Sequence, residues 1–110
     1  MKVEQKGHTT IIRDTQGNFT QFIVKLINEH DTFKNQNLIL DVTHQENIDI
    51  NQLKEAKDLI NMHKKTKKSI VLVAENIDFN AIPKFLIIVP SLLEAHDIIE
   101  MEEIERDLGF

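Results

Sequence analysis

The chain has 110 residues, of which 41% are hydrophobic and 28% charged, so it can form one domain with one buried core. It contains no cysteine, tyrosine or tryptophan, which excludes disulfides and thiolate zinc sites and disfavours base stacking on aromatic rings. The net charge of −5 comes from residues 91–110, which carry one arginine against seven carboxylates. No run approaches the roughly 20 apolar residues of a membrane span, so we expect a cytoplasmic protein with no membrane partner.

The N-terminal part predicts a hairpin followed by a helix. Residues 2–5 and 9–14 are expected to form two strands, and Gly7 between them can take the positive φ of a tight turn. Asn18 suits an N-cap, and apolar residues then recur at i, i+3, i+4, i+7 and i+8. This spacing predicts a helix over residues 19–28.

The middle of the chain predicts a linker, a buried strand and a second helix. Residues 30–37 are polar, whereas residues 38–42 are apolar on both sides of the strand that they would form, which is typical of a central strand. Residues 51–65 follow as a predicted helix that runs into a lysine-rich end, where positive charge opposes the macrodipole. The predicted inner face of this helix consists of Leu53, Ala56, Leu59, Ile60 and His63.

The last third predicts two more strands and a long helix. Residues 69–74 and 85–89 are apolar runs, and the stretch between them has room for one turn of helix at most. Ser91 and Glu94 match the S-x-x-E capping box before a helix over residues 92–108. We expect this helix to be acidic outside and to face the core with Leu92, Ala95, Ile98 or Ile99, Met101, Ile104 and Leu108.

These elements predict a single α/β domain over residues 1–110. Its expected architecture is a layered domain with a mixed, mostly parallel sheet of about five strands, an N-terminal hairpin and three main helices.

The order of elements, and the stretch around the central strand in particular, resembles the STAS domain of anti-sigma factor antagonists. LILDVT at residues 38–43 is similar to the strand of that family, and IDINQL at residues 48–53 falls on its loop and helix start. The resemblance implies a STAS-like fold and a regulatory, protein-binding function. The serine that serves the family as a phosphorylation switch is replaced by Ile50, and Asn51 follows, so no phosphoester can form at either position.

Short bacterial chains of this kind also resemble sequences that carry a ribonuclease Z name. That nuclease requires an H-x-H-x-D-H cluster for its two zinc ions, and the five histidines here form no H-x-H pair. The name would therefore imply a protein associated with ribonuclease Z and tRNA 3′-end processing rather than the nuclease, and we retain this as an alternative function.

Four polar residues near the end of the central strand could carry chemistry. Asp41, His44, Glu46 and Asp49 lie within nine residues, and their side chains could form an acid–base pair or bind a metal. Their spacing matches no specific metal-binding loop, and Asp49 suits the N-terminus of a helix. Turn formation and capping are the simpler interpretation, so we predict no catalysis, metal or other cofactor.

Two charged segments also have a functional and a simpler interpretation. The four lysines of residues 64–68 could contact phosphate or nucleic acid, but a solvated helix end is favoured, because no glycine-rich loop or aromatic residue accompanies them. The carboxylates of residues 92–108 repel one another and gain nothing for folding. A docking surface for a basic protein explains them better than stability does, and a homodimer contact is the alternative.

The sequence therefore predicts a non-catalytic, STAS-like interaction module that binds another protein, whereas a nucleic-acid partner is disfavoured. The candidate partner-binding residues are Thr43, His44, Asp49, Ile50, Asn51, Glu102, Glu103 and Glu105. A further alternative is an anti-sigma factor antagonist that is phosphorylated on another hydroxyl, for example that of Thr43.

Overall fold

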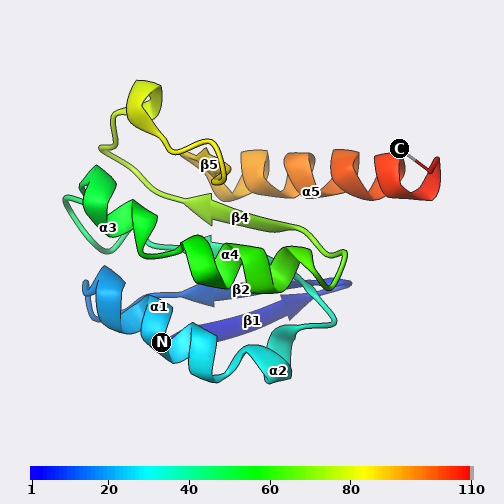
Figure 1. Ribbon diagram of the computed structural model, residues 1–110, viewed down its shortest axis with the longest axis horizontal. Helices are drawn as coiled ribbons and strands as arrows, with labels where there is room; N and C mark the ends of the chain where they lie inside the picture. Colours follow the sequence, from blue (N-terminus) through cyan, green and yellow to red (C-terminus); the bar gives the residue numbers. More distant parts are fainter. Residues whose placement is uncertain (110) are drawn as a thin grey trace.

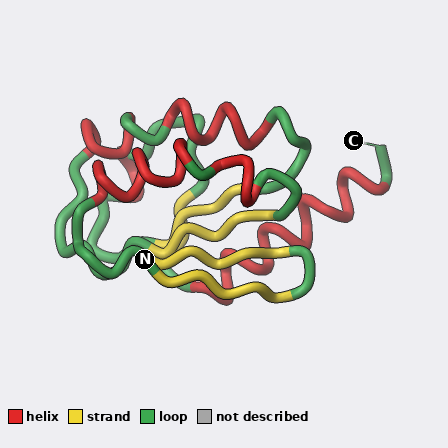
Figure 2. The backbone as a smooth tube through the Cα atoms, turned by 90° about the horizontal axis from the view of Figure 1, so that it is seen from below, coloured by secondary structure: helices red, strands yellow, loops and turns green. Residues whose placement is uncertain are grey.

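A computed structural model of the chain describes residues 1–109 as one sheet with helices on both faces (Figure 1). Helices α1 to α4 cover one face and α5 covers the other (Figure 2). The predicted α/β architecture with a mixed sheet is confirmed. The expected number of three main helices is wrong, since residues 1–109 form five α-helices and one short 3-10 helix.

The five strands lie in the sheet in the order in which they occur in the chain. β1 (Lys2–Lys6) and β2 (Thr9–Arg13) form an antiparallel hairpin, and Gly7 in its turn has a φ of +60°. β3 (Asn37–Asp41), β4 (Ile70–Val73) and β5 (Ile88–Val89) continue the sheet in parallel. The predicted N-terminal hairpin and the mostly parallel sheet are therefore confirmed.

The first crossover contains two helices. α1 (Phe19–Asn28) has the predicted bounds, and the side chain of Asn18 accepts a hydrogen bond from the backbone N–H of Gln21 at 3.1 Å. The linker predicted over residues 30–37 is wrong in its first half, because α2 (His30–Phe33) forms there. His30 and Phe33 are buried on the same side, so tertiary packing orders a segment whose overall polarity predicted a loop.

The second crossover also contains two helices, where the sequence predicted one. α3 (Ile50–Lys54) and α4 (Lys57–Lys64) are separated by a tight turn, in which the N–H groups of Glu55 and Ala56 bond to carbonyls three residues earlier. All five residues of the predicted inner face are buried. The tight turn changes the helix direction while the same apolar spacing continues across it, which explains why the spacing alone does not reveal the break.

β5 is shorter than the strand predicted over residues 85–89. The segment before it forms η1 (Phe79–Ala81), in agreement with the single turn expected there. The backbone N–H of Leu86 then bonds to the carbonyl of Pro83, so the chain is still turning three residues after the proline. Only Ile88 and Val89 lie in register with β4.

The N-cap of α5 (Leu92–Asp107) is Ser91, whose hydroxyl accepts a hydrogen bond from the backbone N–H of Glu94 at 3.2 Å. Ala95 and Ile99 are buried against Ile39, Val71 and Val73 on the sheet. The predicted core-facing stripe is correct for this part of the helix and wrong for Met101, Ile104 and Leu108, which are exposed. Their exposure and spacing place these three on the side of α5 that faces away from the sheet. The C-terminal turns of α5 extend beyond the strands (Figure 1).

Candidate functional site

The loop of residues 42–49 connects the carboxyl end of β3 to α3 and is anchored by Asp41. This carboxylate is 5% exposed and accepts hydrogen bonds from Arg13 Nε at 2.9 Å, from the Thr43 backbone N–H at 3.0 Å and from Thr43 Oγ1 at 2.7 Å. Burial raises the pKa of Asp41, but the hydrogen bonds from Thr43 and the guanidinium of Arg13 outweigh it, so the pKa lies below its ordinary value. Asp41 thus stays ionised and fixes the start of the loop.

The other polar residues of this loop have separate roles. The Asp49 side chain caps α3 by accepting from the backbone N–H of Gln52 at 2.9 Å, and Gln52 Oε1 accepts from the Asp49 N–H at 3.1 Å. His44 is exposed and lies beside Gly17. Among residues 1–109, no three His, Asp or Glu side chains gather closely enough to ligate a metal, so the four residues of the metal hypothesis are not brought together.

A small hollow of about 160 Å³ adjoins this loop at the carboxyl edge of the sheet. Ile50 from α3 is 39% exposed here, Asn51 is exposed beside it, and Phe79 of η1 is 44% exposed. Asp49 and Asp78 supply carboxylates, and the apolar part of the lining comes from Ile48, Ile50, Leu53, Ile77 and Ala81. The β3–α3 and β4–β5 loops thus form one apolar and acidic surface, which we call the loop surface.

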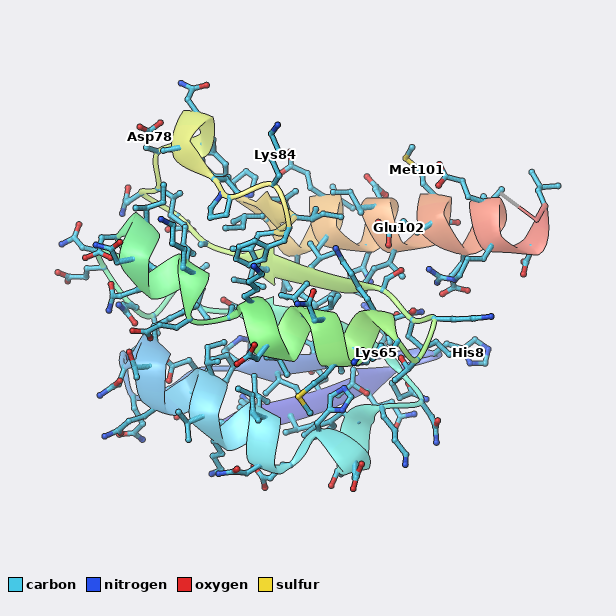
Figure 3. All side chains as sticks on the ribbon, in the orientation of Figure 1. His8, Lys65, Asp78, Lys84, Met101 and Glu102 are labelled. Carbon is cyan, nitrogen blue, oxygen red and sulfur yellow. The ribbon has the colours of Figure 1, made fainter. Side chains whose placement is uncertain are left out.

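The three predicted glutamates of α5 do not share one environment. Glu103 accepts a hydrogen bond from the side chain of Asn37 at 2.6 Å, and Glu102 lies on the sheet side of the helix, whereas Met101 points away from it (Figure 3). Glu105 is exposed. Of the three, Glu105 therefore has a carboxylate on the solvent side, while Glu102 and Glu103 are half-buried beside the body of the domain.

The outer side of α5 carries an apolar stripe of four residues, of which Met101, Ile104 and Leu108 were predicted to face the core. Exposed fractions are 73% for Leu93, 61% for Met101, 54% for Ile104 and 67% for Leu108. Spacings of three, four and eight residues place all four on one side of a helix. The exposed carboxylates that interrupt and flank this stripe are Glu94, Asp97, Glu100, Glu105 and Asp107. We call this combined surface the outer face of α5.

A buried histidine pair lies inside the α1–α4 face. The prediction of His63 as a packing residue is confirmed, since it is fully buried, and its Nδ1 lies 3.0 Å from Nε2 of His30. Burial, followed by the charge on His30, lowers the pKa of His63 to about 4. His30 was not predicted as a partner of His63, because it lies in a segment whose polarity predicts a linker.

No model of a known protein family matches the chain, and a comparison with curated proteins found no match. None of the helices within residues 1–109 is long and apolar enough to cross a membrane.

Proposed function

We propose that this chain is a non-catalytic, STAS-like interaction module that binds another protein through the outer face of α5, with the loop surface as a second contact. The observation that carries the proposal is the apolar stripe of Leu93, Met101, Ile104 and Leu108, with exposures between 54% and 73%. Isolated exposed apolar residues are common on proteins, but four on one side of one helix form a row that a partner could cover.

The charges around this stripe select the kind of partner. All five carboxylates on the outer face of α5 are exposed, whereas Arg106, the one arginine of this helix, is half-buried on the sheet side. A second copy docked through the same face would bring like charges together. A basic amphipathic helix would instead pair its own apolar side with the stripe and its lysines and arginines with the carboxylates. We therefore favour a basic helical segment over a homodimer.

The resemblance of residues 38–53 to a STAS domain, together with a sheet that begins with an antiparallel hairpin and continues in parallel, supports the STAS-like part of the proposal. The Thr43 hydroxyl donates to Asp41 at 2.7 Å. A phosphate on Thr43 would place negative charge against that buried carboxylate, so phosphorylation there is disfavoured. The loop surface therefore serves the proposal as a contact surface without a phosphorylation switch.

Photocrosslinking in the cells that express the protein would test the proposal. A photoreactive residue at position 104 should give a discrete adduct with a second protein, and mass spectrometry should map it to a basic amphipathic helix. The same residue at position 24 is the control, because Val24 is 51% exposed on α1, away from α5. Identical adducts from both positions, or none from position 104, would refute the proposal, and an adduct between two copies would identify a homodimer instead.

A further inference from the structure

An open hollow of about 550 Å³ lies at the end of the sheet opposite the loop surface. It forms where the C-terminal end of α4 and the following loop meet the last turns of α5, near the amino ends of the parallel strands (Figure 1). We call it the basic hollow, and its lining consists of Lys64, Lys67, Lys68, Glu102, Arg106 and Gly109.

Positive charge exceeds negative charge in the described lining of the basic hollow. The ion pairs found among residues 1–109 join Arg13 to Asp41 and Lys34 to Asp31, so none of the four cations of the hollow takes part in one. Lys64 Nζ donates one hydrogen bond, to the carbonyl of Phe85 at 3.3 Å, which leaves its charge uncompensated. Within the described lining, four cations face one carboxylate, that of Glu102, so the cations repel one another and a bound anion would reduce that repulsion.

Arg106 is held in place by buried neighbours. Its guanidinium donates to Ser69 Oγ at 3.0 Å and to Asn37 Oδ1 at 3.4 Å. Ser69 is 2% exposed and Asn37 1% exposed, and the Asn37 amide is itself fixed by Ser69 N–H at 2.9 Å and by Glu103 at 2.6 Å. A guanidinium has five N–H groups, so donors remain for a ligand after these two contacts. Because folding already orients the group, binding would cost less side-chain entropy.

The backbone of the lysine loop gives independent support. Lys67 has a φ of +62°, a conformation that costs a residue with a Cβ roughly 1–2 kcal/mol and that glycine adopts freely. Capping does not require a lysine here, because the N–H groups of Thr66 and Lys67 already bond to the carbonyls of His63 and Lys64. The chain thus places a positive side chain on the wall of the hollow at a position where glycine would favour folding.

We propose that the basic hollow binds a phosphorylated small molecule that carries at least two phosphoryl groups. Arg106 presents the planar donor fork that matches phosphoryl oxygens, and Lys64, Lys67 and Lys68 supply compact charges around it. Glu102 is the acceptor in the same lining and would take a hydrogen bond from a hydroxyl or amine of the ligand. The proposal is independent of the protein-binding proposal, because it concerns the sheet side of α5 and the opposite end of the sheet.

A compact ligand fits the surroundings better than a nucleic acid does. The next surface along α5 is acidic, with exposed Glu105 and Asp107, so an extended chain of phosphates leaving the hollow would meet negative charge. Among residues 1–109, the lining contains no aromatic side chain on which a base could stack. The favourable charge is therefore confined to the hollow itself.

Titration of the ¹⁵N-labelled full chain with inorganic pyrophosphate, followed by NMR, tests the proposal. We expect shifts confined to residues 64–69 and 102–109, with a dissociation constant below about 1 mM in about 150 mM salt. Lys67→Gly removes one charge at a backbone position that suits glycine, so the variant keeps its fold. It should weaken binding by about tenfold, the equivalent of one charge-assisted hydrogen bond.

Lys65→Gln is the matched control, because Lys65 is the exposed neighbour that does not line the hollow. It should change the dissociation constant less than about twofold. Equal losses from the two variants, or no saturable shift with pyrophosphate, would overturn the proposal. A single-stranded RNA oligomer that shifts the same amides at lower concentration than pyrophosphate would also overturn it and would identify the hollow as a nucleic-acid surface.

Discussion

On one face of the sheet, α1–α4 enclose a cluster of eighteen buried apolar residues within residues 1–109, whereas the cluster under α5 contains six. The face under α5 compensates in part with polar contacts, in which Asn37 and Ser69 bind Glu103 and Arg106. The first face therefore provides most of the hydrophobic stabilisation. The second holds one helix by its inner side and leaves the apolar outer side available for a partner.

The largest expected effect comes from a matched pair of core substitutions. Ile60 on α4 is 1% exposed and Ile99 on α5 is 3% exposed. Replacing either by alanine removes the same atoms, but we expect a loss of about 4 kcal/mol for Ile60→Ala and about 2 kcal/mol for Ile99→Ala, because α5 can settle more easily against a thinner core. Urea unfolding of both variants measures the difference, and equal or reversed losses would contradict the contrast between the two faces.

The second largest effect should come from acid, which should lower the free energy of unfolding through the buried histidine of the α1–α4 face. The pKa of His63 is 6.5 in an unfolded chain and about 4 in the fold. Between these values the unfolded chain binds a proton that the folded chain does not, so the free energy of unfolding falls as the pH falls, by at most about 3 kcal/mol. Because the pKa of Asp41 is lowered, this carboxylate takes up its proton below the pH range in which His63 titrates. Unfolding curves between pH 7 and pH 4 measure the loss.

His63→Gln should remove this part of the pH dependence. His44→Gln is the control, because it makes the same substitution at an exposed histidine outside the buried pair. If the His63→Gln curve ran parallel to that of the unsubstituted protein, the histidine pair would not be the source of the pH dependence.

A smaller effect is expected where polar contacts hold α5. Asn37→Ala removes the amide that binds Glu103, Arg106 and the Ser69 N–H, and it leaves buried groups without partners. We expect a loss of about 2 kcal/mol. Hydrogen exchange should rise in the last turns of α5 and remain unchanged in α1, whereas Asn51→Ala, at an exposed position, should change neither. Faster exchange in both helices would mean that the two faces are not stabilised separately.

The smallest effect should come from the outer face of α5. Met101→Ser and Leu108→Ser change side chains that are 61% and 67% exposed, so each should alter the free energy of unfolding by no more than about 0.5 kcal/mol. Thermal unfolding checks this. A loss above about 1 kcal/mol would indicate that the stripe packs within the domain and would remove the basis for a docking surface.

Local sequence patterns predicted the helices and strands whose boundaries are set by neighbouring residues. Asn18 and the apolar spacing after it located α1 to the residue, and the apolar runs located β3 and β4 within one residue at each end. The capping serine likewise located the start of α5. In each case the signal lies within a few residues of the element that it specifies.

The remaining features depend on contacts between distant parts of the chain. α5 has apolar residues on two opposite sides, and their spacing does not determine which side packs on the sheet, so the prediction that Met101, Ile104 and Leu108 face the core is wrong. The sequence shows the lysines of residues 64–68 as a charged segment. Arg106 is distant from them in the sequence and lines the same hollow only in the folded chain. His30 and His63 likewise meet across two helices.

The strand order has a consequence for how the chain folds. Each strand lies beside the one that precedes it in the sequence, separated by one hairpin or one crossover. The entropic cost of closing a loop grows only slowly with its length, so each crossover can bring its strand to the sheet at a moderate cost. As the chain leaves the ribosome, β1 and β2 can pair first, and each later strand finds its neighbour already synthesised. No strand must wait with an unpaired edge for a partner from the far end of the chain, which shortens the time during which it could aggregate.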